Sequence, residues 1–363
     1  MTAPALARPF LGRLRERVTD LAALAVTPLV PADYVDLVDP LRSSNGLRGR
    51  VVEVRPETRD AVTVVIRPGR GWQSHLPGQY VRIGVDVDGV RQWRTYSLTS
   101  EVPRPDRCIA ITVKAIPGGT VSGYLVRRAQ PGLVVQLDQA MGEFVLPATR
   151  PAKVLFVTAG SGITPVMGML RSAGPELADA VLVHSAGTGE DVVFGAELRT
   201  LAAQGRIRLV ERHTGTEGRL TPQALAELVP DLFERETFAC GPNGLLDALA
   251  AHWAAAGAAD RLHVESFRPT VLATGDGGAV TFTRSGRVVQ ADGGVPLLDA
   301  GEAAGVLMPS GCRMGICFGC VLPLREGTVR DLRDGRVTTA QPGDGVLVQT
   351  CISAAAGPCQ LDA

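Results

Sequence analysis

The spacing of apolar residues divides the chain into segments with different periods. Between residues 46 and 150, short β-branched runs with alternating polarity are separated by Pro, Gly and Asp clusters. These runs are RVVEV, AVTVVI, QYVRIGV, IAITVKAI and LVVQL. Closely spaced runs of this kind predict an antiparallel barrel or sandwich, interrupted by one helix at residues 121–128.

A second pattern follows in residues 151–267, where apolar runs alternate with helix-length segments. The apolar runs are KVLFVT, AVLVHS, IRLVE, TFAC and LHVES, and residues 165–173 and 241–256 are two of the helical segments. Alternation of strands and helices predicts a doubly wound α/β domain with a parallel sheet.

The last 85 residues or so, 279–363, combine two short strands, a helix near residues 296–304, a cysteine-rich loop and a closing strand, GVLVQT. Residues 268–278, RPTVLATGDGG, are expected to be a linker. Their Gly and Thr content predicts that the last module can swing on this linker.

An extension at residues 1–45 precedes these modules. Leu11, Leu14, Val18, Leu21 and Ala25 recur at helical spacing, and arginines occupy much of the remaining surface. We expect an amphipathic helix packed on the next domain, in preference to one that docks on a membrane or a partner. A connector punctuated by proline, TPLVPADYVDLVDPL, follows it.

Length and charge narrow the class of protein. The 363 residues suit two to three domains, and 37 basic residues balance 37 acidic ones. This balance argues against a nucleic-acid-binding protein. No apolar run approaches the ~18–20 residues of a membrane span, and no signal-type segment opens the chain. We therefore expect a cytoplasmic protein, and peripheral contact with a membrane-bound partner stays open.

Seven cysteines are present, and three of them fall within nine residues. An odd number clustered in this way favours metal ligands over disulfides. The C-x4-C-x2-C spacing with a distant fourth cysteine is typical of a plant-type 2Fe-2S site, against a zinc site or structural thiols as alternatives. The expected ligands are Cys312, Cys317, Cys320 and Cys351. We expect Cys108 in a core and Cys359 as a spare thiol.

Two further motifs carry chemistry. In RTYSLTS, residues 94–100, an arginine fork suits a phosphate and an aromatic face suits a flavin. The alternative is an ordinary edge strand with one exposed arginine. The glycines of GGTVSGYL open a helix whose first amide groups can bind an anion. In TAGSGITP, residues 158–165, we expect Thr164 as helix N-cap and Pro165 at the first helical position. Pro165 occupies the third glycine's place in the usual dinucleotide fingerprint.

Together these motifs resemble the ferredoxin–NADP reductase superfamily, in particular reductases that carry a C-terminal plant-type ferredoxin. The resemblance covers residues ~47–363 and rests on several motifs. It implies an antiparallel flavin β-barrel, an α/β nucleotide domain and a β-grasp (α+β) ferredoxin domain. The implied cofactors are FAD, with FMN less favoured, a 2Fe-2S cluster, and NADPH or NADH.

The same resemblance implies roles for individual residues. Arg94 would meet a flavin phosphate, Tyr96 would lie against the isoalloxazine ring, and Ser97 would hydrogen-bond near N5. Ser97 and Glu265 are expected to tune the flavin by hydrogen bonding rather than to act as strong acids or bases. The other flavin contacts would be Tyr80, Leu98, Gly118, Gly119, Val121, Ser122 and Phe267. The nicotinamide nucleotide would contact Gly160, Ser161, Gly162, Thr164, Pro165, His184, Ser185, Cys240, Gly241 and Pro242.

The choice between NADPH and NADH rests on weaker signals. Gly187 stands where NADPH-using relatives often carry an arginine, and no acidic residue ends that strand. Arg212 or Arg219 could replace the missing cation, so the balance leans slightly to NADPH. His184 can either contact a ribose or be a neutral residue without a ligand.

The expected function is an electron relay from NAD(P)H through FAD and the cluster to an external protein. The leader TPLVPADYVDLVDPL is similar to that of an actinobacterial subgroup serving membrane acyl desaturases, so a di-iron acyl desaturase or hydroxylase is the first expected acceptor. A ring-hydroxylating oxygenase or acyl-CoA epoxidase is the alternative, and a zinc-stabilised nucleotide-binding scaffold is the alternative from another class. No hydrolase or NTPase motif was found.

Overall fold

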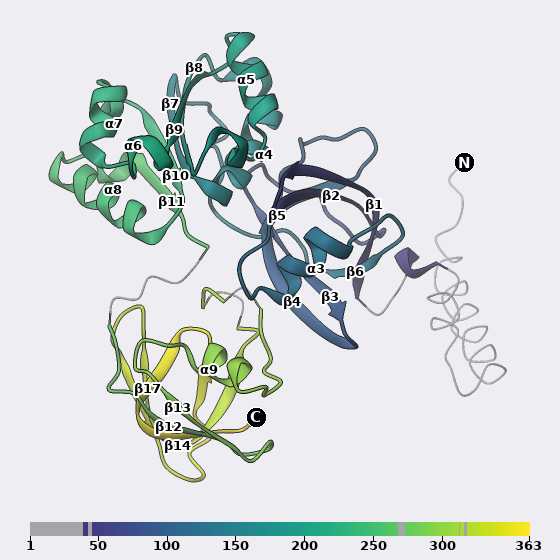
Figure 1. The fold of residues 1–363 in the computed structure, drawn as a ribbon, viewed down its shortest axis with the longest axis vertical. Helices are drawn as coiled ribbons and strands as arrows, with labels where there is room; N and C mark the ends of the chain where they lie inside the picture. Colours follow the sequence, from purple (N-terminus) through teal and green to yellow (C-terminus); the bar gives the residue numbers. More distant parts are fainter. Residues whose placement is uncertain (1–38, 43–45, 268–272, 312, 316–317) are drawn as a thin grey trace, which may run out of the picture.

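The computed structural model describes residues 39–42, 46–267, 273–311, 313–315 and 318–363. The expected N-terminal helix falls outside these residues, and only the short turn η1 (Pro40–Arg42) is described before the first strand. Three modules follow, which we call the first (46–150), second (151–267) and third (273–363) module. In Figure 1 they lie at the corners of a triangle, with the second module at the top, the first at the right and the third, in green to yellow, at the bottom.

The first module is a closed antiparallel barrel. Its strands run in the order β4-β3-β6-β1-β2-β5, and every neighbouring pair is antiparallel. A bridge between Leu98 and Ile111 joins the two ends, which confirms a barrel rather than a sandwich. The bounds are β1 (Leu47–Thr58), β2 (Ala61–Pro68), β3 (Tyr80–Val87), β4 (Val90–Ser97), β5 (Ile109–Lys114), β6 (Val134–Leu137) and helix α3 (Thr120–Arg128).

The second module is the expected doubly wound parallel sheet, in the order β11-β10-β7-β8-β9. Helices α4 and α5 pack on one face and α7 and α8 on the other, because their apolar residues join separate cores. The strands are β7 (Lys153–Ala159), β8 (Asp179–Ala186), β9 (Arg208–His213), β10 (Glu236–Cys240) and β11 (Leu262–Glu265). The helices are α4 (Ile163–Ala173), α5 (Gly195–Ala203), α6 (Thr214–Glu217), α7 (Pro222–Leu228) and α8 (Asn243–Ala255).

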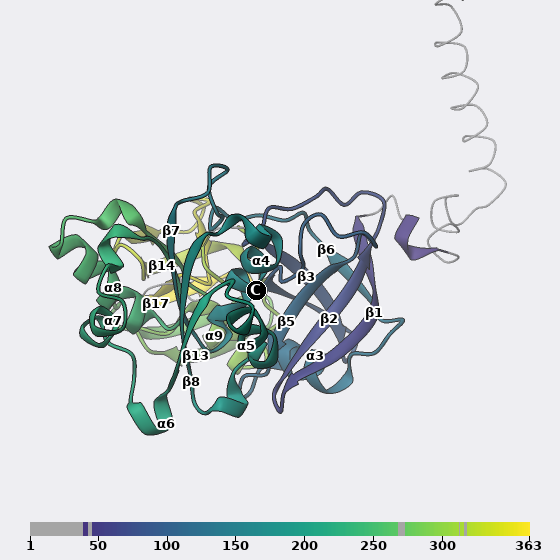
Figure 2. The same ribbon diagram turned by 90° about the horizontal axis from the view of Figure 1, so that it is seen from above.

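Helix α4 attaches the second module to the barrel, and Figure 2 shows it between the two. A Cβ at Gly168 would clash with the carbonyl oxygen of Leu98, so glycine permits the close approach. Arg171 Nη1 donates to the Thr99 carbonyl at 2.5 Å, and the amide of Val102 donates to Ser172 Oγ at 3.0 Å. These contacts fix the end of β4 relative to the second half of α4.

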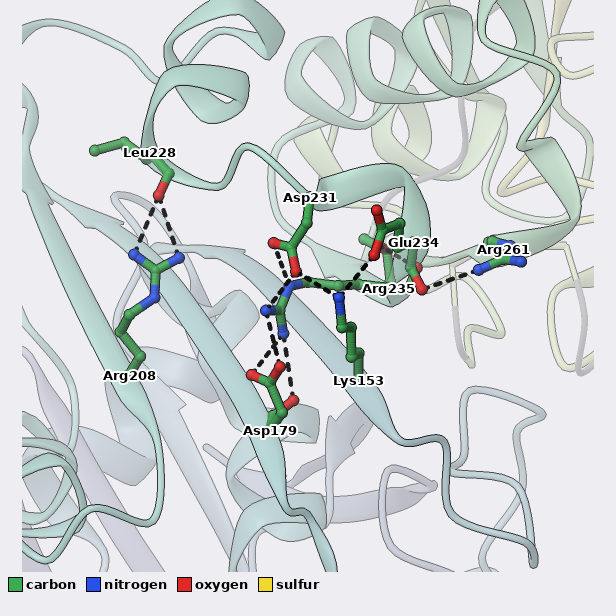
Figure 3. A network of polar contacts seen from close by, with 9 residues as sticks. Lys153, Asp179, Arg208, Leu228, Asp231, Glu234, Arg235 and Arg261 are labelled. Carbon is green, nitrogen blue, oxygen red and sulfur yellow. Dashed lines mark hydrogen bonds and ion pairs between the residues drawn. The ribbon is translucent and has the colours of Figure 1, made fainter.

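A network of charges closes the opposite, amino-terminal edge of this sheet (Figure 3). The Arg235 side chain, only 7% exposed, donates to both Asp179 and Asp231 at 2.8 Å. Lys153 also binds Asp231, at 3.1 Å, and binds Glu234 at 2.7 Å. The network ties the starts of β7 and β8 to the turn before β10, far from the carboxyl ends where a nucleotide would bind.

The third module has the expected β-grasp arrangement. Its sheet order is β13-β12-β17-β14-β15, with β16 paired to β14, and only β12 and β17 are parallel neighbours. Helix α9 packs on the sheet through Leu297 and Ala300. The bounds are β12 (Gly278–Phe282), β13 (Arg287–Ala291), α9 (Leu297–Ala303), β14 (Val321–Asp331), β15 (Val337–Ala340), β16 (Leu347–Gln349) and β17 (Ser353–Leu361).

Two expectations for this region require correction. The chain does not close on GVLVQT, because β17 follows it and carries Cys359, which is 3% exposed in the core and not a spare thiol. Residues 273–278, expected to be linker, are bonded to the third module. The amides of Ala273 and Gly277 donate to carbonyls of Leu332 and Ala355, at 3.2 and 3.1 Å. Of the expected linker, the remaining residues 268–272 lie outside the described part of the chain.

Candidate functional site

The strand order creates one special edge in the second module. The chain passes from β7 to β8 and β9, then returns to place β10 on the other side of β7. Ligands of such sheets bind beyond the carboxyl ends of the strands where the order reverses, which here lies between β7 and β10. The turns that follow these two strands are Gly160–Gly162 and Cys240–Pro242, two of the sequence-predicted motifs.

These two turns meet directly. A Cβ on Gly162 would overlap the Cys240 carbonyl, so only glycine fits there. Gly160 has φ +55°, a left-handed conformation, and open space where its Cβ would point. Gly241 is also close, with Ala159 Cβ 3.2 Å from the position a Cβ would take. The surface above Gly160 can therefore admit a ligand close to the backbone.

The start of α4 differs from the expected one. Gly162 is the N-cap, and Thr164 lies inside the helix, with Oγ1 donating to the Ser161 carbonyl at 2.9 Å. Pro165 is therefore the third helical residue rather than the first, a position in the opening turn that proline tolerates. Neither a side-chain cap nor an acidic residue occupies this end of α4, which leaves its amide groups able to receive a phosphate.

One line of residues crosses all five strands near this edge. Strand pairing aligns, in order, Glu265, Cys240, Thr158, His184 and Glu211. Burial raises the pKa of the Glu265 carboxyl to about 7, and no hydrogen bond to it is found within the described residues. Burial, and then the nearby Glu265 carboxylate, raises the pKa of the Cys240 thiol well above its usual value. The Cys240 thiol is therefore protonated and unreactive at neutral pH.

Of the two interpretations of His184, the structure favours the neutral one. The side chain is fully buried, Nδ1 lies 2.8 Å from Thr158 Oγ1, and burial lowers its pKa to about 4. Ser185, the other expected ribose contact, is 5% exposed and pairs with Arg212 across β8 and β9. His184 therefore stabilises the carboxyl ends of β7 and β8 from inside the sheet and is not exposed at the surface.

Strand β4 holds the flavin motif. Arg94 Nη1 donates to the Trp93 carbonyl at 2.8 Å, and burial lowers its pKa. Burial raises the pKa of the Tyr96 hydroxyl far above its usual value, and Ser97 is 6% exposed. The neighbouring Thr95 Oγ1 is buried and makes no hydrogen bond within the described residues. Consecutive residues of a strand point to opposite faces, so Arg94 and Tyr96 share the face of β4 that fits a polar cofactor, and Thr95 lies on the other face.

The start of α3 supplies the second half of this site. Gly119 is the N-cap without a side-chain bond, Gly118 has φ +72°, and the first turn carries no acidic residue. Ser122 lies in that turn, with Oγ 3.4 Å from the amide of Ile116. Val121 is 1% exposed, so only its backbone can face a ligand. Amide groups at the start of a helix that contacts β4 fit a pyrophosphate.

The remaining expected flavin contacts differ in exposure. Tyr80 pairs with Ser97 across β3 and β4 and is 6% exposed, with its ring against Gly142. Leu98 is fully buried in the barrel core, so its side chain is not at a surface. Phe267, which is 39% exposed, lies just beyond β11, and Pro242 caps α8.

Two of the four expected cluster ligands are described. Cys320 and Cys351 are 1% and 3% exposed and share a small apolar core with Leu298 and Ile352. The amide and hydroxyl of Thr350 both donate to the Cys320 carbonyl, at 3.2 and 2.9 Å, which holds the two cysteine segments together. Cys312 and Cys317 lie outside the described residues. Two buried thiols in one apolar core fit the surroundings of an iron–sulfur cluster.

Comparison with known proteins agrees with this division. Family models of an oxidoreductase FAD-binding domain, an oxidoreductase NAD-binding domain and a 2Fe-2S iron-sulfur cluster binding domain match residues 72–146, 156–251 and 280–356. An NADPH oxidoreductase of Mycobacterium tuberculosis is 50% identical over 94% of this chain and 91% of its own. The chain belongs to the flavin-dependent NAD(P)H oxidoreductases that carry a 2Fe-2S domain.

Two further proteins are similar to this oxidoreductase over most of its length. The ferredoxin reductase component of 3-ketosteroid-9-alpha-monooxygenase from M. tuberculosis is 33% identical over 84% of this chain and 92% of its own. Phthalate dioxygenase reductase shares the fold, with a TM-score of 0.59 and 23% identity over 87% of this chain and 97% of that one. FAD, NAD(P) and 2Fe-2S domains are thus present in one chain, which contradicts the alternative of a zinc-stabilised nucleotide-binding scaffold.

Sequence patterns missed several residues that shape the oxidoreductase. Thr95 and Thr158 lie inside the two motifs, but the predicted contacts were assigned to other residues of those motifs. The alternation of side chains along a strand would have placed Thr95 on a buried face. Arg171 gave no signal, because only the folded structure brings α4 to the barrel. Gln349 also gave no signal in the sequence. Its Nε2 donates to the carbonyl oxygen of Gly315 at 3.0 Å, and the two residues are 34 positions apart in the chain.

Proposed function

We propose that this oxidoreductase takes electrons from NADPH and delivers them to a separate oxygenase, most specifically a di-iron acyl desaturase or hydroxylase. The observation that carries the proposal is the meeting of Gly162 with Cys240 at the switch point, beside a barrel joined to it by α4. When bound, the nicotinamide supplies a hydride, the flavin converts two electrons into single ones, and the cluster carries them onward.

The residues of this chain act mainly by binding and orientation. The first turns of α3 and α4 supply amide groups to phosphates, and Arg94 adds a cationic fork. Tyr96 and the Cys240 turn would hold the two rings in line, which lowers the barrier by orientation. Glu265 can hold a proton on its carboxyl near neutral pH, because burial raises its pKa to about 7.

A preference for NADPH is supported by the ends of β8 and β9. Arg219 is exposed and makes no hydrogen bond or ion pair within the described residues. Arg212 is engaged, since its Nη2 and Nε donate to the carbonyls of Glu217 and Gly218 at 2.6 and 3.2 Å. Arg219 is therefore the better candidate for an additional phosphate. The name of the 50% identical relative points the same way.

An oxygenase acceptor is supported by the relatives that serve monooxygenases. The acyl desaturase is supported by the leader at residues 27–41. No helix among the described residues is both long and apolar enough to cross a membrane.

The test is an anaerobic absorption titration with NADPH and, separately, NADH. We expect flavin and cluster bands to bleach together at lower concentrations of NADPH. Bleaching by NADH alone would overturn the nucleotide assignment, and flavin bleaching without a cluster signal would overturn the relay. Turnover with a purified acyl desaturase and a ring-hydroxylating oxygenase then separates the acceptors, and turnover with the latter alone would overturn the desaturase assignment.

A further inference from the structure

Arg313 directly follows Cys312 in the sequence of the cysteine loop, residues 312–320, and has an unusual backbone conformation. Its φ is +59°, in the left-handed region that is unfavourable for a residue with a side chain. Such a conformation persists only where surrounding contacts hold it. The contacts of the Arg313 side chain are therefore informative.

Two carboxylates of α9 hold this side chain. Arg313 Nη1 donates to Asp299 Oδ1 at 2.8 Å, and Nη2 donates to both carboxylate oxygens of Glu302, with Oε2 at 2.6 Å. Asp299 and Glu302 are three residues apart and lie on the same face of α9. The Arg313 and Glu302 side chains are only 25% and 33% exposed, so water screens the pair less than at an open surface.

The same charges face a residue of the first module. Burial lowers the pKa of Arg94 on β4, and the charge of Arg313 lowers it further, whereas Glu302 and Asp299 act in the opposite direction. The third module lies beside the barrel in Figure 1, consistent with this electrostatic contact. The hydrogen bonds of Arg94 go to its own strand, at Trp93 and Gln92. Arg313 and Arg94, which belong to different modules, therefore repel one another, and the Asp299 and Glu302 carboxylates act against this repulsion.

We propose that Asp299 and Glu302 are positioning residues that fix the cysteine loop through Arg313 and offset the repulsion between Arg313 and Arg94, so that the third module docks beside strand β4. The four groups sum to zero charge, and removing either carboxylate leaves a net positive charge at the contact. Both effects would act on the step between flavin and cluster and leave nucleotide binding unchanged. The proposal rests on the electron path proposed above.

The test compares the holoprotein with the double variant Asp299→Asn, Glu302→Gln. After anaerobic mixing with NADPH, we expect the rate of flavin bleaching to be unchanged. Cluster bleaching should slow by about tenfold, within the range known for coupling between sites. Small-angle X-ray scattering without nucleotide should show a larger radius of gyration. Asp334→Asn is the control in the same module. Asp334 accepts from the Arg336 amide at 2.9 Å, which asparagine can also do, and its ion pair with the Arg336 side chain is long, at 3.7 Å.

Adding Arg313→Gly to the double variant tests the mechanism. Glycine accepts the left-handed conformation and removes the repelling charge. We expect cluster bleaching to recover to within about twofold of the original protein, while Arg313→Gln alone should lose iron and sulfide faster under a chelator. An unchanged cluster phase in the double variant, or no recovery with glycine, would overturn the proposal. Failure of the flavin to bleach in the unmodified protein would instead count against the proposed function.

Discussion

Gly162 and the carbonyl oxygen of Cys240 approach so closely that a single added methyl group would overlap the oxygen. The two residues come from turns about 80 residues apart, and the parallel pairing of β7 with β10 brings them together. The turn at Gly160–Gly162 and the turn at residues 240–242 therefore form one surface, and a shift in either displaces the other.

The first prediction concerns this contact. Gly162→Ala should destabilise the second module by about 2 kcal/mol, because a rigid backbone atom cannot move aside. It should also raise the KM for NADPH more than tenfold while flavin and iron contents stay normal. Steady-state kinetics and cofactor analysis measure both. Gly244→Ala is the control, since no atom lies within 4 Å of its Cβ position. Equal effects of the two substitutions would contradict the close contact.

Arg219 provides the second prediction. Arg219→Gln should raise the KM for NADPH roughly tenfold and leave that for NADH unchanged, since a hydrogen bond to a charged group contributes about 1.5 kcal/mol or more. The kcat should not change, because the side chain is remote from the rings. Arg206→Gln is a suitable control, as Arg206 lies before β9, at the other end of that strand. An equal rise in the KM for NADPH and for NADH would show that Arg219 does not bind the additional phosphate of NADPH.

The fold was predictable where local pattern and tertiary position agree. The alternating runs of the barrel and the buried runs of the parallel sheet each bury the side chains that their period indicates. Strand β17 escaped detection because its sequence, SAAAGPCQL, combines alanines with Gly and Pro. Ala354 and Ala355 are strand residues only because β17 lies between β12 and β14, where small side chains fit a crowded core.

Predicting the site depended more on chemistry than on period. The four cysteines and the glycine turns have characteristic spacing, so they could be identified from sequence. The bond between Thr158 and His184 depends on strand register, and the Arg313 contacts depend on how α9 packs beside the loop. The start of α4 shows the limit of local pattern, because the turn at Gly160–Gly162 leads into a helix that begins at Ile163, two residues before the expected Pro165.

Buried histidine makes stability depend on pH. The pKa of His184 is about 4 in the folded protein, against an ordinary value of 6.5, so the unfolded chain binds the proton more strongly. Stability should therefore fall as pH decreases from 6.5 to 4, by up to about 3 kcal/mol. His75, also with a pKa of about 4, should add to the loss. Urea unfolding of His184→Gln against pH should show a smaller acid loss, and an identical profile would contradict the assignment.

Arg235 should contribute stability without affecting catalysis. Arg235→Met would leave Asp179 and Asp231 facing each other without their shared cation. We expect a loss of about 2 kcal/mol, below the value for fully buried pairs because both carboxylates are partly exposed. Calorimetry measures the change in unfolding temperature. Arg208→Gln is the control, since Arg208 donates only to the Leu228 carbonyl and should change stability little. A lower kcat in Arg235→Met at temperatures where it stays folded would contradict a purely structural role.

Glu265 is expected to behave in the opposite sense to His184. Its folded pKa of about 7 exceeds the ordinary 4.5, so the folded protein binds the proton more strongly. Stability is therefore present below pH 4.5 and is lost as pH rises through 7, because a buried carboxylate must then ionise without a partner. Glu265→Gln should stabilise the protein by about 2 kcal/mol at pH 8 and by nothing near pH 4. Urea unfolding at the two pH values, with Glu326→Gln as an exposed control, measures this. Because the Glu265 carboxylate lowers stability at pH 8, we expect it to act on a ligand beside Cys240. A Glu265→Gln variant that is more stable but reduces the flavin at an unchanged rate would contradict a role of Glu265 in flavin reduction.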